Sequence, residues 1–225
     1  MRVILVIWAA VMVWLLFLKN KEVNLPSRYG RSQLGYFATP EGAEWLYDAK
    51  VVAPGTNGMA FNIPASFRAE DTQYVQNGKS YQRMRFAMDG IPGKGIGEKT
   101  NEVKLTRHDP YGQYEASLRH PELPELKLAP NPMTVGQTWR VVEGPYEIFG
   151  KVVGQETVTI NGEDYEKCFH LRVPLPDGGS LERWLSPEVG LVKMEIMTNK
   201  GARILMNLRQ YKSGGPKLRE VKLDD

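Results

Sequence analysis

The chain has 225 residues, 42% of them apolar, so it can bury a substantial core and is neither a disordered nor a fibrous protein. The formal net charge is +3, and acidic and basic residues are interleaved, which excludes the broad cationic face of a nucleic-acid-binding protein. The single cysteine, Cys168, excludes an intrachain disulfide and a four-ligand metal site built on cysteines. We expect Cys168 to face the core as a small apolar side chain.

The amino-terminal segment is the most apolar part of the chain. Residues 3–18, VILVIWAAVMVWLLFL, contain no charge and are followed by Lys19 and Lys21. As a helix this run would be about 24 Å long, slightly less than the ~30 Å hydrocarbon core of a bilayer. The polar residues after it offer no small-x-small cleavage site and no nearby cysteine for lipidation. We therefore expect residues 1–20 to be a retained transmembrane signal anchor, with a cleaved signal peptide as the alternative.

Two observations bear on the side of the membrane where the rest of the chain lies. The positive charges after the apolar run outnumber Arg2 before it, which favours the cytoplasm. In bacteria, however, a signal anchor followed by a soluble β-rich domain is typical of export, and long domains translocate largely regardless of their charge. We expect a bacterial inner-membrane protein with a periplasmic domain, and the cytoplasmic side stays open as the alternative.

A polar tether over residues 21–33 leads into a β-rich region at residues 34–211. Short runs rich in β-branched and aromatic residues, many of them alternating, are separated there by Gly, Pro, Asn and Asp. No segment after the anchor carries a sustained helical period. We expect a mainly β domain with an antiparallel sheet, followed by a polar tail at residues 212–225 that is mobile or docks on a partner.

Three pairs of motifs recur in the same order along the β-rich region. GAEW at 42–45 matches GQTW at 136–139, NGKSYQRM matches NGEDYEKC, and RHDPYGQYEA resembles WLSPEVGLVKMEI. Asn-Gly is the favoured corner of a type I′ hairpin, because both of its residues take positive φ at little cost. The shared order predicts an internal duplication, with pseudo-repeats at residues 34–118 and 126–208.

Large aromatic residues stand at matching places in the two pseudo-repeats. A tryptophan buries about 150–250 Å² and can organise a small β core. We expect the tryptophan after each Gly-x-x motif to point into the core, with a paired aromatic clamp for a ligand as the alternative. The predicted core residues are Trp45, Trp139, Trp184, Tyr81 and Tyr165.

The second half carries two motifs of a known kind. Pro132, Gly136 and Trp139 form a Pro, Gly-x-x-Trp pattern, and the strand at 184–193 ends in a Pro-x-x-Gly-Leu-Val-Lys turn. These motifs resemble a loose group of bacterial extracytoplasmic proteins, many of them lipoproteins, best over residues 126–197 and weakly over the first half. The resemblance implies a half-barrel or open barrel, broadly like the carriers of lipoproteins, and implies no catalytic residues. This chain lacks the lipidated cysteine of the group.

Few residues form a pattern with catalytic chemistry. GKGIG at 93–97 looks like a phosphate-binding loop, but such loops lead into a helix, and strand-like sequence follows here. His108, His120 and His170 lack metal-ligand spacing, and His108 with Asp109 is as readily a turn as half of a catalytic dyad. We therefore predict no catalytic residue, no cofactor and no metal site, and expect that the protein is not an enzyme.

Two parts of the chain are candidates for contact with a partner. The prolines of HPELPELKLAPNPM at 120–133 are expected to prevent regular strand pairing and to leave an extended strip, which loses little entropy on docking. In the anchor, two small residues would let another transmembrane helix approach closely. The candidate contact residues are Ala9, Ala10, Pro121, Pro124 and Pro130.

These features favour a membrane-anchored, non-catalytic interaction protein, such as an accessory subunit of a larger membrane complex, with an integral membrane protein as its partner. One alternative is an extracytoplasmic binder or carrier of lipid or another apolar ligand, whose hollow the nine methionines and the aromatics could line. Another is an unrecognised hydrolase. A filled core would favour the interaction protein, and a long apolar tunnel would favour the carrier.

Overall fold

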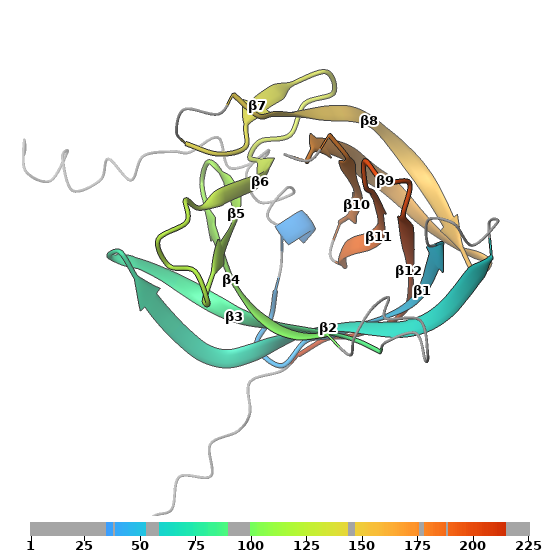
Figure 1. Ribbon diagram of the computed structural model, residues 1–225, viewed down its shortest axis with the longest axis horizontal. Coiled ribbons are helices and arrows are strands. Elements are labelled where there is room, and N and C mark those ends of the chain that lie inside the picture. Colours follow the sequence, from blue (N-terminus) through green and yellow to red (C-terminus); the bar gives the residue numbers. More distant parts are fainter. Residues whose placement is uncertain are drawn as a thin grey trace, which may run out of the picture.

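In a computed structural model of the protein, the chain forms one antiparallel sheet of twelve strands that curls into a nearly closed barrel (Figure 1). The expected mainly β, antiparallel architecture is confirmed, and the sheet closes further than the half-barrel or open barrel that the resemblance implies. The structure describes residues 35–37, 39–52, 59–89, 100–143, 147–175, 178–187 and 189–214.

The strands follow one another along the chain as two runs of six, preceded by a short 3₁₀ helix, η1 (Gly35–Phe37). The first run consists of β1 (Glu44–Val52), β2 (Ala60–Gln76), β3 (Lys79–Met88), β4 (Thr100–Asp109), β5 (Gly112–Ser117) and β6 (Leu126–Pro130). The second run consists of β7 (Thr138–Arg140), β8 (Phe149–Ile160), β9 (Glu163–Pro174), β10 (Ser180–Ser186), β11 (Gly190–Met197) and β12 (Arg203–Lys212).

The first and last strands are neighbours in the sheet, whose order is β6-β5-β4-β3-β2-β1-β12-β11-β10-β9-β8-β7. β1 pairs with β12 from Glu44↔Lys212 to Val52↔Arg203. In β1 every second side chain faces the interior, as expected for a strand: the buried residues are Trp45, Tyr47, Ala49 and Val51. The two runs of strands are therefore joined along the full length of β1.

The barrel closes at a narrow seam between β6 and β7. Leu126 and Val142 form an isolated antiparallel bridge, and the Lys127 amide donates to the Val141 carbonyl at 2.7 Å. The indole Nε1 of Trp139 donates to the Lys127 carbonyl at 2.8 Å. Since β7 has only three residues, this seam depends on a side chain as much as on the backbone.

The three motif pairs occupy equivalent places in the two runs of strands. Trp45 is the second residue of β1, and Trp139 is the second residue of β7. Asn77 and Asn161, each with positive φ (50° and 54°), turn β2 into β3 and β8 into β9. The Pro-containing turns join β4 to β5 and β10 to β11. The duplication itself stays a prediction, which superposition of residues 34–118 on 126–208 tests.

The predicted core residues lie in more than one cluster. Trp45, Trp139, Trp184 and Tyr81 are buried, and Tyr165 is half-buried. Trp45 and Trp139 belong to separate clusters, and Tyr81 packs with Leu105 and Ala116 in a third. Cys168 is buried as expected, its Sγ donates to the Tyr165 carbonyl at 3.1 Å, and burial raises its pKa to about 11.

The proline-rich segment is more regular than expected. Contrary to the prediction that its prolines prevent pairing, Leu126–Pro130 is strand β6 and pairs with β5. Pro130 is the last residue of this strand, opposite Gly112, and a proline without an N–H is tolerated at such a strand end. Pro130 is buried, so it does not belong to an exposed strip, whereas Pro121 and Pro124 are exposed.

Several predictions fall on residues outside those that the structure describes. They concern the anchor at 1–20 with Ala9 and Ala10, the tether at 21–33, the GKGIG segment at 93–97 and most of the tail at 212–225. Within the described residues, no helix has the length and apolar character needed to cross a bilayer.

Candidate functional site

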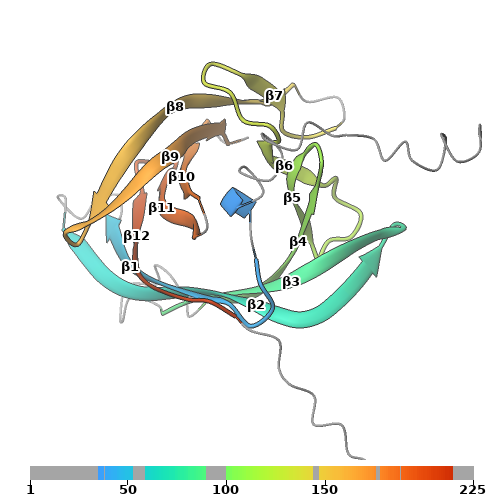
Figure 2. The same ribbon diagram turned by 180° about the vertical axis from the view of Figure 1, so that it is seen from behind.

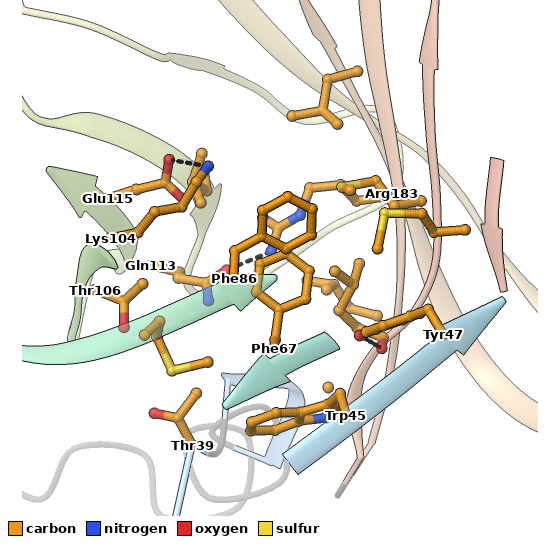
Figure 3. A pocket seen from close by; sticks show the side chains of 18 of the residues that line it. Thr39, Trp45, Tyr47, Phe67, Phe86, Lys104, Thr106, Gln113, Glu115 and Arg183 are labelled. Atoms are coloured by element: carbon orange, nitrogen blue, oxygen red, sulfur yellow. Dashed lines mark hydrogen bonds and ion pairs between the residues drawn. The ribbon is translucent and has the colours of Figure 1, made fainter. Parts of the chain in front are cut away.

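The barrel contains a cavity of about 390 Å³, within the range of about 300–1,000 Å³ that ligand sites usually have. Its walls come from both runs of strands, and most of the side chains that line it are apolar (Figure 3). The aromatic and sulfur-containing lining residues are Tyr36, Phe37, Trp45, Tyr47, Phe67, Phe86, Met84, Met88, Met194 and Met206.

One wall of the cavity is a row of aromatic rings on β1, β2 and β3. The rings of Phe67 and Phe86 have centroids 4.7 Å apart, and Tyr47 meets Phe67 edge to face at 5.8 Å. The Tyr47 hydroxyl donates to the Leu191 carbonyl, and Trp45 Nε1 donates to the Val189 carbonyl, both at 2.7 Å. Because backbone carbonyls satisfy these polar atoms, the wall presents apolar ring surface to the cavity.

The 3₁₀ helix η1 lies inside the ring of strands, as the two opposite views of the barrel show (Figures 1 and 2). The Tyr36 hydroxyl donates to the Lys167 carbonyl at 2.8 Å, and the ring packs edge to face on Phe169 at 5.2 Å. Phe37 stacks on the ring of His108 with centroids 6.0 Å apart. The segment before β1 therefore fills part of the barrel and limits the cavity.

A polar group interrupts the apolar lining where β10 faces β4 and β5. Arg183 is only 6% exposed, and its Nη2 donates to the side-chain oxygen of Gln113 at 3.1 Å. Among the described residues, Nη1 has no hydrogen-bond partner. Burial lowers the pKa of the Arg183 guanidinium, and the charge of Glu115 opposes this shift. The guanidinium is thus a buried cation without a carboxylate in direct contact among those residues.

His108 stands next to this group. Its Nε2 lies 3.0 Å from the hydroxyl of Thr39, and Nδ1 is buried with no partner in the part of the chain that is described. Burial lowers the pKa of His108 to about 4, and the nearby guanidinium of Arg183 acts in the same direction. His108 is therefore neutral at ordinary pH.

Further polar residues on β4 and β5 line the cavity beside the aromatic wall. Lys104 Nζ lies 2.9 Å from a carboxylate oxygen of Glu115, which partly neutralises both charges. The side chains of Glu102 and Thr106 also line the cavity. The lining is therefore apolar on β1–β3 and β11–β12, and polar on β4–β5.

The three histidines singled out in the sequence are not brought together. His108 faces the cavity region, His120 is exposed beside Glu122, and His170 stacks on Trp184 with centroids 4.2 Å apart. Asp109 does not complete a dyad with His108, because it bonds to Arg107 and caps the turn to β5. Among the described residues, no group of three His, Cys, Asp or Glu side chains could hold a metal ion.

Trp184 and Arg183 are adjacent in sequence but lie on opposite faces of β10. Leu181, Arg183 and Leu185 line the cavity, so the alternation of a strand turns Trp184 to the other face. There its Nε1 donates to Glu156 at 2.6 Å, and Lys193 lies 4.3 Å from the ring centroid. Trp184 is buried as predicted and belongs to the same hydrophobic cluster as Trp45, on the strand face opposite Arg183.

The segment before β6 lies against the outer face of β3–β5. Glu125 accepts hydrogen bonds from Lys79 at 2.8 Å, from the Tyr81 hydroxyl at 3.0 Å and from two nitrogens of Arg107 at 2.5 and 2.8 Å. Desolvation acts to raise the pKa of Glu125, but these bonds together outweigh it and lower the pKa. Part of the predicted partner strip is thus held on the barrel itself.

Sequence reasoning missed Arg183, which is the most buried charged residue of the cavity. A signal for it exists in LERWLS, where Leu181, Arg183 and Leu185 share one face of a strand. A base between two apolar residues of the same face is expected to be enclosed by the core.

Among known proteins, the chain is similar to solved structures only. No family model and no curated protein matches the chain. A protein described as exported, with a YmcC-like fold, from Bacteroides fragilis is 14% identical with a TM-score of 0.46, over 79% of this chain and 99% of that one. A protein described as a lipoprotein from Parabacteroides distasonis is 13% identical with a TM-score of 0.42, over 79% and 98%.

A third solved structure belongs to a protein described as an outer membrane lipoprotein-sorting protein domain, from Vibrio parahaemolyticus. It is 10% identical to this chain with a TM-score of 0.28, over 86% of this chain and 95% of that one. At these identities and TM-scores, the likeness gives no information on the function of this chain.

Proposed function

We propose that the protein is a non-catalytic binder of an apolar ligand, and that the ligand lies in the barrel cavity. The observation that carries this proposal is the cavity of about 390 Å³ with aromatic and methionine side chains from both runs of strands in its walls. An apolar hollow of this kind favours the carrier or binder over an interaction protein with a filled core.

The lining suits an alkyl chain. Each methylene group that leaves water contributes about 0.8 kcal/mol, so a chain of moderate length is bound without any ion pair. Met84, Met194 and Met206 line the cavity from three different strands, and the flexible thioether lets a wall adapt to ligands of different shape. The ligand class that fits best is therefore a molecule with one long alkyl chain.

Membrane attachment is part of the proposal. The predicted helix at residues 1–20 would hold the barrel, on the extracytoplasmic side, next to the bilayer that supplies apolar ligands. Confinement to a membrane raises the effective concentration of the binding site near its ligand. The predicted duplication fits this role, because two half-sheets together build walls that neither could build alone.

The accessory-subunit hypothesis has less support among the described residues. Pro130 is buried in β6, and Glu125 holds the preceding segment on the barrel, so the exposed part of the predicted strip is reduced to residues such as Pro121 and Pro124. Contact with a membrane protein partner through Ala9 and Ala10 stays a prediction.

Photo-crosslinking of the full-length protein in bilayer nanodiscs tests the proposal. A dodecanol carrying a diazirine at the end of its alkyl chain would be activated by light, and the adducts would be mapped by mass spectrometry. We expect adducts on cavity residues of distant strands, such as Met84 on β3 and Met206 on β12. Adducts confined to exposed residues, such as Val135 and Phe149, would contradict the proposal.

A matched pair of substitutions controls this experiment. Met206 is 1% exposed and lines the cavity, whereas Val135 is 54% exposed and lies outside it. Met206→Trp fills part of the cavity and is expected to reduce the adducts on Met84. Val135→Trp adds the same side chain at the surface and is expected to leave these adducts unchanged.

A further inference from the structure

We propose that the ligand is an anionic amphiphile with one alkyl chain, and that Arg183 binds its oxyanion headgroup inside the barrel. This inference rests on the proposed function, since it names the chemistry of the ligand in the same cavity. The headgroup is a carboxylate or a phosphate, and both present oxygen atoms that a guanidinium binds in the same way.

Arg183 leaves hydrogen-bond donors unused among the described residues. A guanidinium has five N–H donors, and the one hydrogen bond that Arg183 makes among the described residues runs from Nη2 to Gln113 at 3.1 Å. Nη1 is buried there without a partner. A buried cation with unused donors is costly unless an anion or further acceptors meet it.

Few negative charges in the described part of the chain act on Arg183. Glu115 is the carboxylate whose charge acts on the guanidinium. Its carboxylate oxygen lies 2.9 Å from Lys104 Nζ, which partly neutralises that charge. His108 is neutral, and the Tyr47 hydroxyl donates to a backbone carbonyl, so neither supplies a negative charge. Among the described residues, the direct partner of Arg183 is an uncharged amide, which leaves the guanidinium available to an oxyanion.

Arg183 lines the same cavity as the apolar wall of aromatic rings and methionines. Arg183 and the rings of Phe67 and Phe86 line the same cavity (Figure 3). An amphiphile can therefore place its headgroup on the guanidinium while its alkyl chain lies along the rings and methionines. Lys104 also lines the cavity but is paired with Glu115, so Arg183 beside an apolar wall is the feature that distinguishes an anionic amphiphile from a neutral lipid.

Binding of three probes with the same alkyl chain tests the inference: dodecanoate, dodecyl phosphate and 1-dodecanol. The full-length protein would be placed in phosphatidylcholine nanodiscs, and binding would be measured by equilibrium dialysis against empty nanodiscs. We expect at least one anion to bind about tenfold to a hundredfold more tightly than the alcohol, as a charge-assisted hydrogen bond predicts. The stronger of the two anions identifies the headgroup.

Three variants separate binding of the headgroup by Arg183 from a general effect of protein charge. Arg183→Met should reduce the affinity for the preferred anion to that for the alcohol and leave the alcohol unchanged, whereas Arg183→Lys should keep a preference for the anion. Arg209→Met removes a cation that is 51% exposed on β12 and should change neither affinity. If Arg183→Met does not fold, the wild type and Arg183→Lys still decide the outcome.

The pKa of the bound acid can be measured by NMR, and it would not change if Arg183 had only a structural role. The ¹³C resonance of carboxyl-labelled dodecanoate reports its ionisation, and the pKa of the bound acid should be lower in the wild type than in Arg183→Met. Equal affinity of the wild type for all three probes would overturn the inference and leave the proposed function intact. Failure of every probe to bind would overturn both.

Discussion

The guanidinium of Arg183 on β10 and the side-chain amide of Gln113 on β5 form a hydrogen bond of 3.1 Å inside the barrel. These strands are not neighbours in the sheet, and the two residues are 70 positions apart in the chain. The bond therefore links the two runs of strands across the interior. It also places the only direct partner of a buried cation, among the described residues, on the opposite wall.

The first prediction concerns this pair. Gln113→Leu should destabilise the protein by about 1–3 kcal/mol, because it removes the acceptor of a buried charged donor. The double variant Arg183→Met with Gln113→Leu should be as stable as the wild type or up to about 4 kcal/mol more stable, because it removes the buried charge as well. Chemical denaturation measures both. A double variant less stable than Gln113→Leu alone would show that Arg183 stabilises the fold.

The second prediction concerns the seam between β6 and β7. A Cβ atom added at Gly150 would clash with the ring of Trp139, whereas one added at Gly154 on the same strand would meet nothing within 4 Å. Gly150→Ala should therefore cost about 1–3 kcal/mol through overpacking. Gly154→Ala should be close to neutral. Thermal unfolding compares the two variants, and equal melting temperatures would mean that Trp139 does not pack tightly at the seam.

The hairpin corners and the strand alternation could be predicted from the sequence, because both depend on local chemistry. Asn77 adopts positive φ in its turn, and Trp45 points inward at the start of β1. The seam between β6 and β7 could not be predicted, because β7 has only three residues and the seam rests on one isolated bridge and on the indole of Trp139, which leave no alternating strand pattern in the sequence. The proline content of residues 120–133 predicts an unpaired linker, but residues 126–130 form β6 and Glu125 is bonded to Arg107 on β4.

The candidate site, too, could be predicted only in part from the sequence. Methionines and aromatics can either line a hollow or fill it, and composition does not decide between the two. Arg183 resembles an ordinary surface base when it is read alone. Its burial becomes visible only when Leu181 and Leu185 are placed on the same inward face and β5 is placed opposite.

The third prediction concerns Glu125 and acid stability. Its pKa is lowered in the folded protein from the ordinary value of 4.5, so its ionised form stabilises the fold above that pH, and this contribution is lost as the pH falls through the lowered pKa. Glu125→Gln should cost about 1–3 kcal/mol at neutral pH. The difference from the wild type should shrink below pH 4.5. Denaturation curves at several pH values test this, and a constant difference would contradict it.

The fourth prediction concerns His108, whose pKa is lowered by burial from 6.5 to about 4. Between these values the unfolded chain takes up a proton that the folded protein does not, so stability falls as the pH decreases. The loss should reach about 3 kcal/mol, since each pKa unit corresponds to 1.36 kcal/mol. His108→Gln should lack this part of the pH dependence. Parallel pH profiles of the two proteins would show that His108 titrates normally.

We propose above all that an alkyl chain occupies the barrel cavity. A crystal structure of the protein with a dodecanol that carries bromine at the end of its chain tests it most directly, because the anomalous signal locates the bromine atom. We expect a bromine peak inside the barrel, in contact with the side chains of Phe67, Phe86 or Met206. A peak found on the outer surface alone, with the cavity filled by ordered water, would contradict it.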